Sequence, residues 1–124
     1  MHSRRTMIVA LLGLALGVAI GAFGAHGLES TLEAHGRQDT FETAVKYHMY
    51  HMLGLLLFGL WQMHSQRKSG HVAWLLLAGV LIFSGSLYLL SVTNIKWLGA
   101  ITPIGGVAFI AAWLSWAWEL SKQQ

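Results

Sequence analysis

Histidine and hydroxyl side chains recur at helical spacing along this chain, and these residue types could carry chemistry. Counted from Ala44 at steps of three and four residues, Tyr47, His48 and His51 share one face of a helix. Ser84 and Tyr88 lie four residues apart further along the chain. Neutral imidazoles are good metal ligands, and hydroxyl groups donate and accept hydrogen bonds. The pattern predicts a polar cluster whose role depends on the elements that position it.

Those elements are apolar segments long enough to cross a membrane. Hydrophobic residues make up 55% of the 124 residues and charged residues 10%, whereas about a quarter of the residues of a soluble domain are charged. A bilayer core needs roughly 20 apolar residues per helix, and four segments reach that length: residues 7–25, 44–63, 72–92 and 99–118. We expect an all-α membrane protein, a single polytopic domain whose four transmembrane helices form an antiparallel bundle.

The positive charges predict the orientation of this bundle, because cytoplasmic segments retain Lys and Arg. Five positive charges fall on one side of the predicted bundle, at Arg4, Arg5, Arg67, Lys68 and Lys122. Three fall on the other side, at Arg37, Lys46 and Lys96. We therefore expect both the N and C termini in the cytoplasm. Residues 26–43 become an external loop, in which residues 28–40 could form a short amphipathic helix on the surface.

The polar residues gather at the external ends of the four segments. The candidate cluster consists of His26, Tyr47, His48, His51, Ser84, Tyr88 and Thr102. A rise of 1.5 Å per residue places His51 about 10 Å inside the membrane, where we expect it to bond to a hydroxyl group of the cluster or to a backbone carbonyl. The cytoplasmic halves offer mainly apolar side chains, apart from Gln62 and Ser115.

Several functions are compatible with this inventory. The favoured one is a structural role, or the binding of a small ligand or lipid at the polar cluster. One alternative is a metal or haem site formed by His26, His48 and His51, although their spacing matches no recognised zinc motif and no cofactor is predicted. Another alternative is a transport component.

Other functions fit the sequence poorly. Acid or base catalysis is disfavoured because the predicted spans contain no carboxylate, and the absence of cysteine excludes dithiol chemistry. The few positive charges are scattered, so we expect no nucleic-acid partner.

Small residues recur every four positions in the first segment, at Gly13, Gly17, Gly21 and Ala25. Such a ridge lets another helix approach closely. The partner is either a neighbouring helix of the same chain, which we favour, or a second copy in a homo-oligomer built through Gly13, Gly17 and Gly21. Membrane lipids are the other expected partners. The length of the segment and this packing pattern argue against a cleaved signal peptide.

Four ordered motifs resemble those of a known family: GAFGAHGL at 21–28, TAVKYH at 43–48 followed by His51, FSGSLY at 83–88 and TPIGG at 102–106. The chain resembles the domain of unknown function 423 family, small four-helix membrane proteins that include bacterial inner-membrane members and the animal transmembrane protein 256 group. The resemblance covers nearly the whole chain. It implies a multi-pass protein of the bacterial inner (plasma) membrane, and it implies no established activity.

Overall fold

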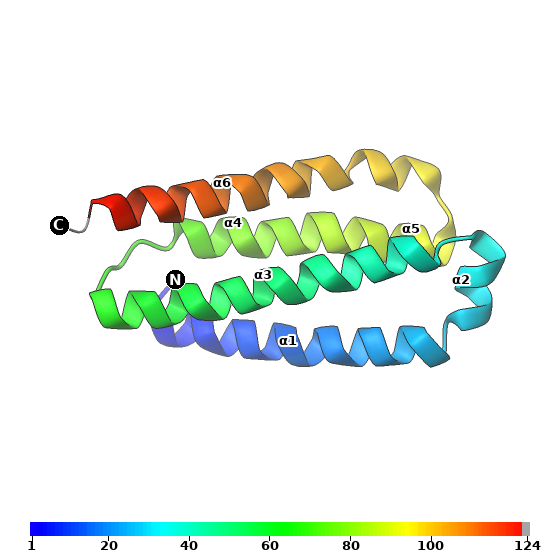
Figure 1. Ribbon diagram of the computed structural model, residues 1–124, viewed down its shortest axis with the longest axis horizontal. Coiled ribbons are helices and arrows are strands. Elements are labelled where there is room, and N and C mark those ends of the chain that lie inside the picture. The colour runs from blue at the N-terminus through cyan, green and yellow to red at the C-terminus, as the bar shows by residue number, and fades with distance from the viewer. Residues whose placement is uncertain (123–124) are drawn as a thin grey trace.

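A computed structural model describes residues 1–122, and it is helical throughout with no strand among them (Figure 1). The elements in chain order are α1 (Ser3–His26), α2 (Glu29–His35), α3 (Gln38–Ser65), α4 (His71–Gly79), the π-helix η1 (Val80–Ser84), α5 (Gly85–Thr93), the 3-10 helix η2 (Lys96–Ala100) and α6 (Thr102–Ser121). Helices α4, η1 and α5 follow one another without a break and form one continuous rod.

The long rods α1, α3, α4–η1–α5 and α6 lie side by side, and each runs antiparallel to the rod before it (Figure 1). Helix α3 packs against both α1 and the α4–η1–α5 rod, which in turn packs against α6. The start of α1 and the end of α6 lie at one end of the bundle, which we call the terminal end (Figure 1). Helix α2 and η2 lie at the opposite end, which we call the α2 end. A short helix is thus present in the predicted range 28–40, but α2 ends at His35, and residues 38–40 belong to α3.

Short connections allow this antiparallel packing, and they rely on residues that adopt left-handed backbone conformations. Gly36 closes α2 with φ of 62°, Gln66 closes α3 with φ of 54°, and Asn94 closes α5 with φ of 55°. A left-handed residue after the last turn commonly ends a helix. Pro103 lies in the first turn of α6, where its missing amide hydrogen costs nothing. Left-handed residues therefore end two of the rods, α3 and the α4–η1–α5 rod, and also the short helix α2.

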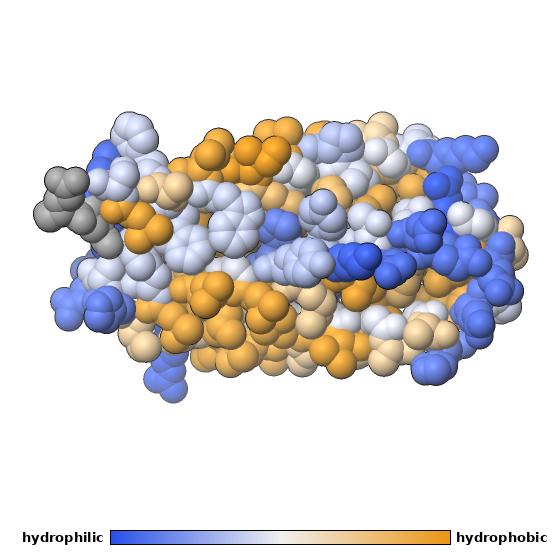
Figure 2. Space-filling view, in the orientation of Figure 1, coloured by the Kyte–Doolittle hydropathy of each residue, from blue (hydrophilic) through white to orange (hydrophobic). Residues whose placement is uncertain are grey.

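Three helical stretches are long and apolar enough to cross a membrane: Ser3–His26, His71–Thr93 and Lys96–Ser121. They contain three of the four predicted spans. The other predicted span, 44–63, lies within α3, which is long enough but less apolar because it carries Lys46, His48 and His51. Figure 2 shows hydrophilic residues gathered at both ends of the bundle and hydrophobic residues over much of the surface between them.

The core lies along α3, where Leu55 and Phe58 are fully buried together with Leu76 of α4. Glycines bring the other rods close to this core. A Cβ atom on Gly17 of α1 would lie 2.5 Å from the Sδ atom of Met49, so α1 and α3 touch at that level. The small-residue ridge of α1 thus faces α3 of the same chain, which is the contact that we favoured for it.

Candidate functional site

His48 joins three rods through the two nitrogens of its ring. Nε2 lies 2.9 Å from the carbonyl oxygen of Gly13 in α1, and Nδ1 lies 2.9 Å from the hydroxyl oxygen of Tyr88 in α5. A carbonyl oxygen can only accept, so Nε2 must carry the hydrogen. In the neutral ring Nδ1 is then the acceptor for the Tyr88 hydroxyl group. Both polar atoms of His48 are thus satisfied although the residue is only 3% exposed.

His51 lies on the side of α3 that faces α6. Its Nδ1–H group donates to the carbonyl oxygen of Tyr47 at 2.7 Å, one turn earlier in the same helix. The imidazole ring stacks on Phe109 with the ring centroids 3.4 Å apart, and Trp113 lies 5.9 Å away. A backbone carbonyl was one of the partners expected for His51. The aromatic packing against α6 was not expected, because nothing in the sequence states which rod His51 faces.

The hydroxyl groups of the predicted cluster make separate bridges between the rods. Ser84, in the π-helix η1, donates to the carbonyl oxygen of Ala44 at 2.8 Å. Ser86 and Thr102 share a hydrogen bond of 2.7 Å that links α5 to the start of α6. Ser84, Ser86 and Thr102 are all buried. A π-helical turn often marks a functional position, and here it lies where Ser84 reaches the neighbouring rod.

The structure brings together only part of the predicted cluster. His48 lies beside Gly17 of α1. His26 lies nine residues after Gly17 in the same helix, which at the helical rise is about 13 Å from Gly17. His26 is exposed at the end of α1. His48 faces α1 and α5 whereas His51 faces α6, so the three histidines proposed as ligands do not converge. Among residues 1–122 no group of three His, Asp or Glu side chains could hold a metal ion.

Helix α2 lies across the α2 end of the bundle, where side-chain hydrogen bonds hold it in place. His35 donates from Nδ1 to the carbonyl oxygen of Ser91 at 3.0 Å, and the Nε of Arg37 donates to the side chain of Asn94 at 3.1 Å. Leu32 is buried beneath the helix. Helix α2 therefore packs on α5 and is held there by the hydrogen bond from His35, and it also borders a groove.

This groove, which we call the α2 groove, lies between α1, α2 and α3 and has a volume of about 450 Å³. Its wall is mostly apolar and includes Gly21, Gly24, Ala25, Leu32, Phe41 and Val45. Its polar residues are Glu29, Gln38, Glu42 and Lys46. Lys46 and Glu42 form an exposed ion pair at 3.4 Å, and within residues 1–122 Glu29 makes no ion pair. Pockets for small ligands commonly have volumes of 300–1,000 Å³ with a few polar groups.

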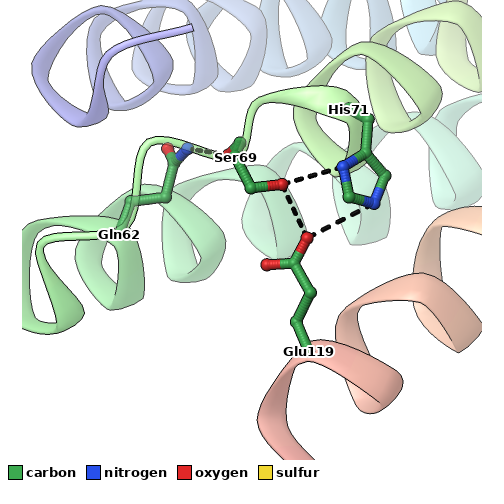
Figure 3. Close-up of polar contacts among 4 residues, drawn as sticks. All are labelled: Gln62, Ser69, His71 and Glu119. Atoms are coloured by element: carbon green, nitrogen blue, oxygen red, sulfur yellow. Dashed lines mark hydrogen bonds and ion pairs between the residues drawn. The ribbon is translucent and has the colours of Figure 1, made fainter. Parts of the chain in front are cut away.

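A second polar cluster lies at the terminal end, and apart from Gln62 its members lie just outside the predicted spans (Figure 3). Gln62 accepts from Thr6 at 3.1 Å and donates to the carbonyl oxygen of Ser69 at 2.5 Å. The Ser69 hydroxyl group donates to Glu119 at 2.6 Å, and His71 approaches both of these residues. Glu119 is only 7% exposed. We call these five residues the terminal cluster; they join all four rods.

The terminal cluster was hard to predict from the sequence. Its members come from four separate places along the chain, and Glu119 lies one residue beyond the last predicted span. Gln62 was the one available signal, because a lone amide in an apolar segment needs polar partners. The other four members lie outside the predicted spans, so the cluster does not contradict the expectation of mainly apolar side chains within them.

Comparison with known proteins identifies the family. Residues 20–106, which contain all seven residues of the predicted outer cluster, match the family described as Protein of unknown function (DUF423). A UPF0382 membrane protein of Staphylococcus saprophyticus is 48% identical over 108 residues, which cover 87% of this chain and 89% of the relative. The UPF0382 membrane protein YwdK of Bacillus subtilis is 47% identical over 113 residues, with the same two coverages. No solved structure matches the chain. The resemblance found in its motifs is thus confirmed, and the chain belongs to the DUF423 family of membrane proteins.

Proposed function

We propose that the protein is a four-span protein of the bacterial inner membrane that binds a phospholipid in the α2 groove. The observation that carries this proposal is the groove itself, an apolar wall with charged residues at one edge. Phosphatidylethanolamine is the ligand class that fits best. Its ammonium group matches Glu29, its phosphate matches Lys46, and an acyl chain would lie along the apolar wall.

The proposed topology places α3 in the membrane with the three more apolar rods. Helix α3 buries the two histidines near its middle, His48 and His51, against its neighbours. Lys46 is exposed near the α2 end, where a long side chain can extend its ammonium group to the membrane surface. The distribution of Lys and Arg supports a cytoplasmic terminal end. The α2 groove would then open in the outer leaflet.

The charges of the groove favour a headgroup that carries an ammonium group. Glu42 is already paired with Lys46, so the Glu29 carboxylate is left with the local negative charge. A negative charge next to an apolar wall suits an amphiphile better than a small polar solute. Gly21 and Gly24 contribute no side chain to the wall, and Val45 and Phe41 of α3 pack directly against them.

We assign the buried outer cluster a structural role in this proposal. The polar atoms of His48, Ser84 and Thr102 that bond between rods are paired within the protein, which leaves them little capacity for a ligand. Leu55 and Phe58 are fully buried between His51 and Gln62 along α3. A continuous polar path would have to pass these side chains, so binding is favoured over conduction by one protomer.

The test is native mass spectrometry of the delipidated full-length protein titrated with phosphatidylethanolamine. We expect one tightly retained lipid on the wild type. Ala25→Phe should reduce its occupancy severalfold because the phenyl ring fills the groove. Ala22→Phe is the matched control, since Ala22 is an exposed α1 residue that does not line the groove.

A charge variant separates headgroup recognition from shape. Glu29→Gln should weaken phosphatidylethanolamine and leave phosphatidylcholine, whose ammonium group cannot donate a hydrogen bond, little changed. Glu33→Gln on the same helix is the control, because Glu33 is exposed and lies outside the groove. Equal retention of this lipid by the wild type and by Ala25→Phe would reject the proposed binding function.

A further inference from the structure

We propose that the terminal end carries a second, separate lipid site, which binds the headgroup of an anionic phospholipid of the phosphatidylglycerol class. The site is a pocket of about 520 Å³ between the α3–α4 connection and the end of α6. Two cations, Arg67 and Lys122, line it together with the hydroxyl groups of Ser69 and Ser115. This site lies at the opposite end of the bundle from the α2 groove.

Glu119 is a buried charged residue in the wall of this pocket. It lines the pocket although the residue is 93% buried, since its exposed fraction is 7%. Its Oε1 atom accepts from the Ser69 hydroxyl group at 2.6 Å and lies 3.3 Å from Nε2 of His71. Its Oε2 atom is buried and has no hydrogen-bond partner among residues 1–122. A buried carboxylate oxygen without a partner requires a donor, and the ligand can supply it.

The hydrogen bonds around Glu119 show how its negative charge is offset. The Ser69 hydroxyl group donates its single hydrogen to Glu119. The Nδ1 of His71 lies 2.8 Å from the Ser69 hydroxyl oxygen and must therefore donate a hydrogen to that oxygen. A protonated His71 would then also donate from Nε2 to Glu119. The Oε1 side of the carboxylate is therefore occupied (Figure 3). Within residues 1–122 neither Arg67 nor Lys122 forms an ion pair, so both could bind an anion.

The position of Lys122 also fits an anion site. Its ammonium group lies 4.4 Å from the centre of the Trp118 ring, a cation–π contact that holds it beside the pocket. Cations clustered where a helix leaves the membrane attract anionic headgroups by about 1 kcal/mol each, which is about fivefold in affinity. Arg67 and Lys122 together outnumber the one carboxylate of the pocket.

A lipid fits better than free phosphate because the pocket continues onto an apolar surface. Leu114 and Trp118 line it and are 67% and 62% exposed, which suits an acyl chain. The phosphodiester would lie between Arg67 and Lys122, and a headgroup hydroxyl could donate to Glu119. Phosphatidylglycerol supplies the phosphodiester, the hydroxyl groups and a net charge of the right sign.

The test is native mass spectrometry of the delipidated full-length protein with phosphatidylglycerol, with phosphatidylcholine of the same acyl chains and with inorganic phosphate. We expect one phosphatidylglycerol to be retained and phosphatidylcholine to be lost. Arg67→Gln and Lys122→Gln should each weaken retention about fivefold. Arg4→Gln is the matched control, because Arg4 is exposed at the same end and does not line the pocket.

Three results would overturn this proposal. An equal loss in Arg4→Gln and Arg67→Gln would mean a general surface potential without a site. Equal retention of phosphatidylcholine would remove the headgroup selectivity, and displacement of the lipid by millimolar inorganic phosphate would mean a phosphate site. Circular dichroism checks that the variants are folded. Ala25→Phe in the α2 groove should leave phosphatidylglycerol retention unchanged, so the two lipid sites can fail independently.

Discussion

The imidazole of His48 donates to the carbonyl oxygen of Gly13 at 2.9 Å, although 35 residues separate them in the chain. Gly17 explains how this contact forms. A Cβ atom at Gly17 would lie 3.4 Å from Nε2 of His48 but only 2.5 Å from Sδ of Met49, so glycine lets α1 approach α3 closely enough for this hydrogen bond. The small-residue ridge and the polar cluster therefore depend on each other at this crossing.

His48→Ala should destabilise the protein because it leaves two buried groups, the carbonyl oxygen of Gly13 and the hydroxyl group of Tyr88, without their partner. We expect a loss of about 2–4 kcal/mol, from the cavity and the unpaired groups together. The measurement is the free energy of unfolding in detergent micelles titrated with sodium dodecyl sulfate. His48→Gln, which keeps one donor and one acceptor, should lose less than half as much. Equal losses in the two variants would reject the hydrogen-bonding role.

Tyr88→Phe isolates the other bond of His48. Removal of the hydroxyl group should cost about 0.6 kcal/mol, the average for side-chain hydrogen bonds between membrane helices, and at most about 1.7 kcal/mol. The same unfolding titration measures the loss. Tyr50→Phe is the control, since Tyr50 is 58% exposed and makes no side-chain hydrogen bond among residues 1–122. If Tyr88→Phe is as stable as Tyr50→Phe, the bond to His48 contributes nothing measurable.

The sequence predicted the helical class, three of the spans and the presence of polar residues near the α2 end, because apolar length and helical periodicity are local properties. It did not predict the partners within the cluster. Whether Tyr88 meets His48 or His51 depends on how far each rod is rotated about its axis. That rotation is decided by contacts such as the stacking of His51 on Phe109, which lie far apart in the sequence.

Gly105→Ala should be strongly destabilising, by about 1–3 kcal/mol. A Cβ atom at Gly105 would collide with the backbone nitrogen and Cα of Phe83, which cannot move without displacing the rod. Gly85→Ala is the control, because nothing lies within 4 Å of a Cβ atom there and alanine favours helix formation. Melting temperatures in one detergent compare the two. If the Gly105→Ala protein had the same melting temperature as the Gly85→Ala protein, α6 would not approach η1 this closely.

The terminal cluster allows the most direct test of a network, since Thr6 and Gln62 are bonded to each other and both are buried. Thr6→Val keeps the side-chain shape and leaves the Oε1 of Gln62 unpaired, whereas Gln62→Leu also removes the donor to Ser69. We expect the free energy of unfolding to fall by about 1 kcal/mol in Thr6→Val and by about 2–3 kcal/mol in Gln62→Leu.

The double variant should lose less than the sum of the two single variants, because each single change already breaks the shared bond. Unfolding titrations of the four proteins give this coupling energy, expected at about 0.5–1.5 kcal/mol. Thr93→Val is the control for Thr6→Val, because the Thr93 hydroxyl group is exposed and bonds only within its own helix and turn. Strict additivity would mean that Thr6 and Gln62 do not interact, and the hydrogen-bonded connection between α1 and α3 at the terminal end would have to be abandoned.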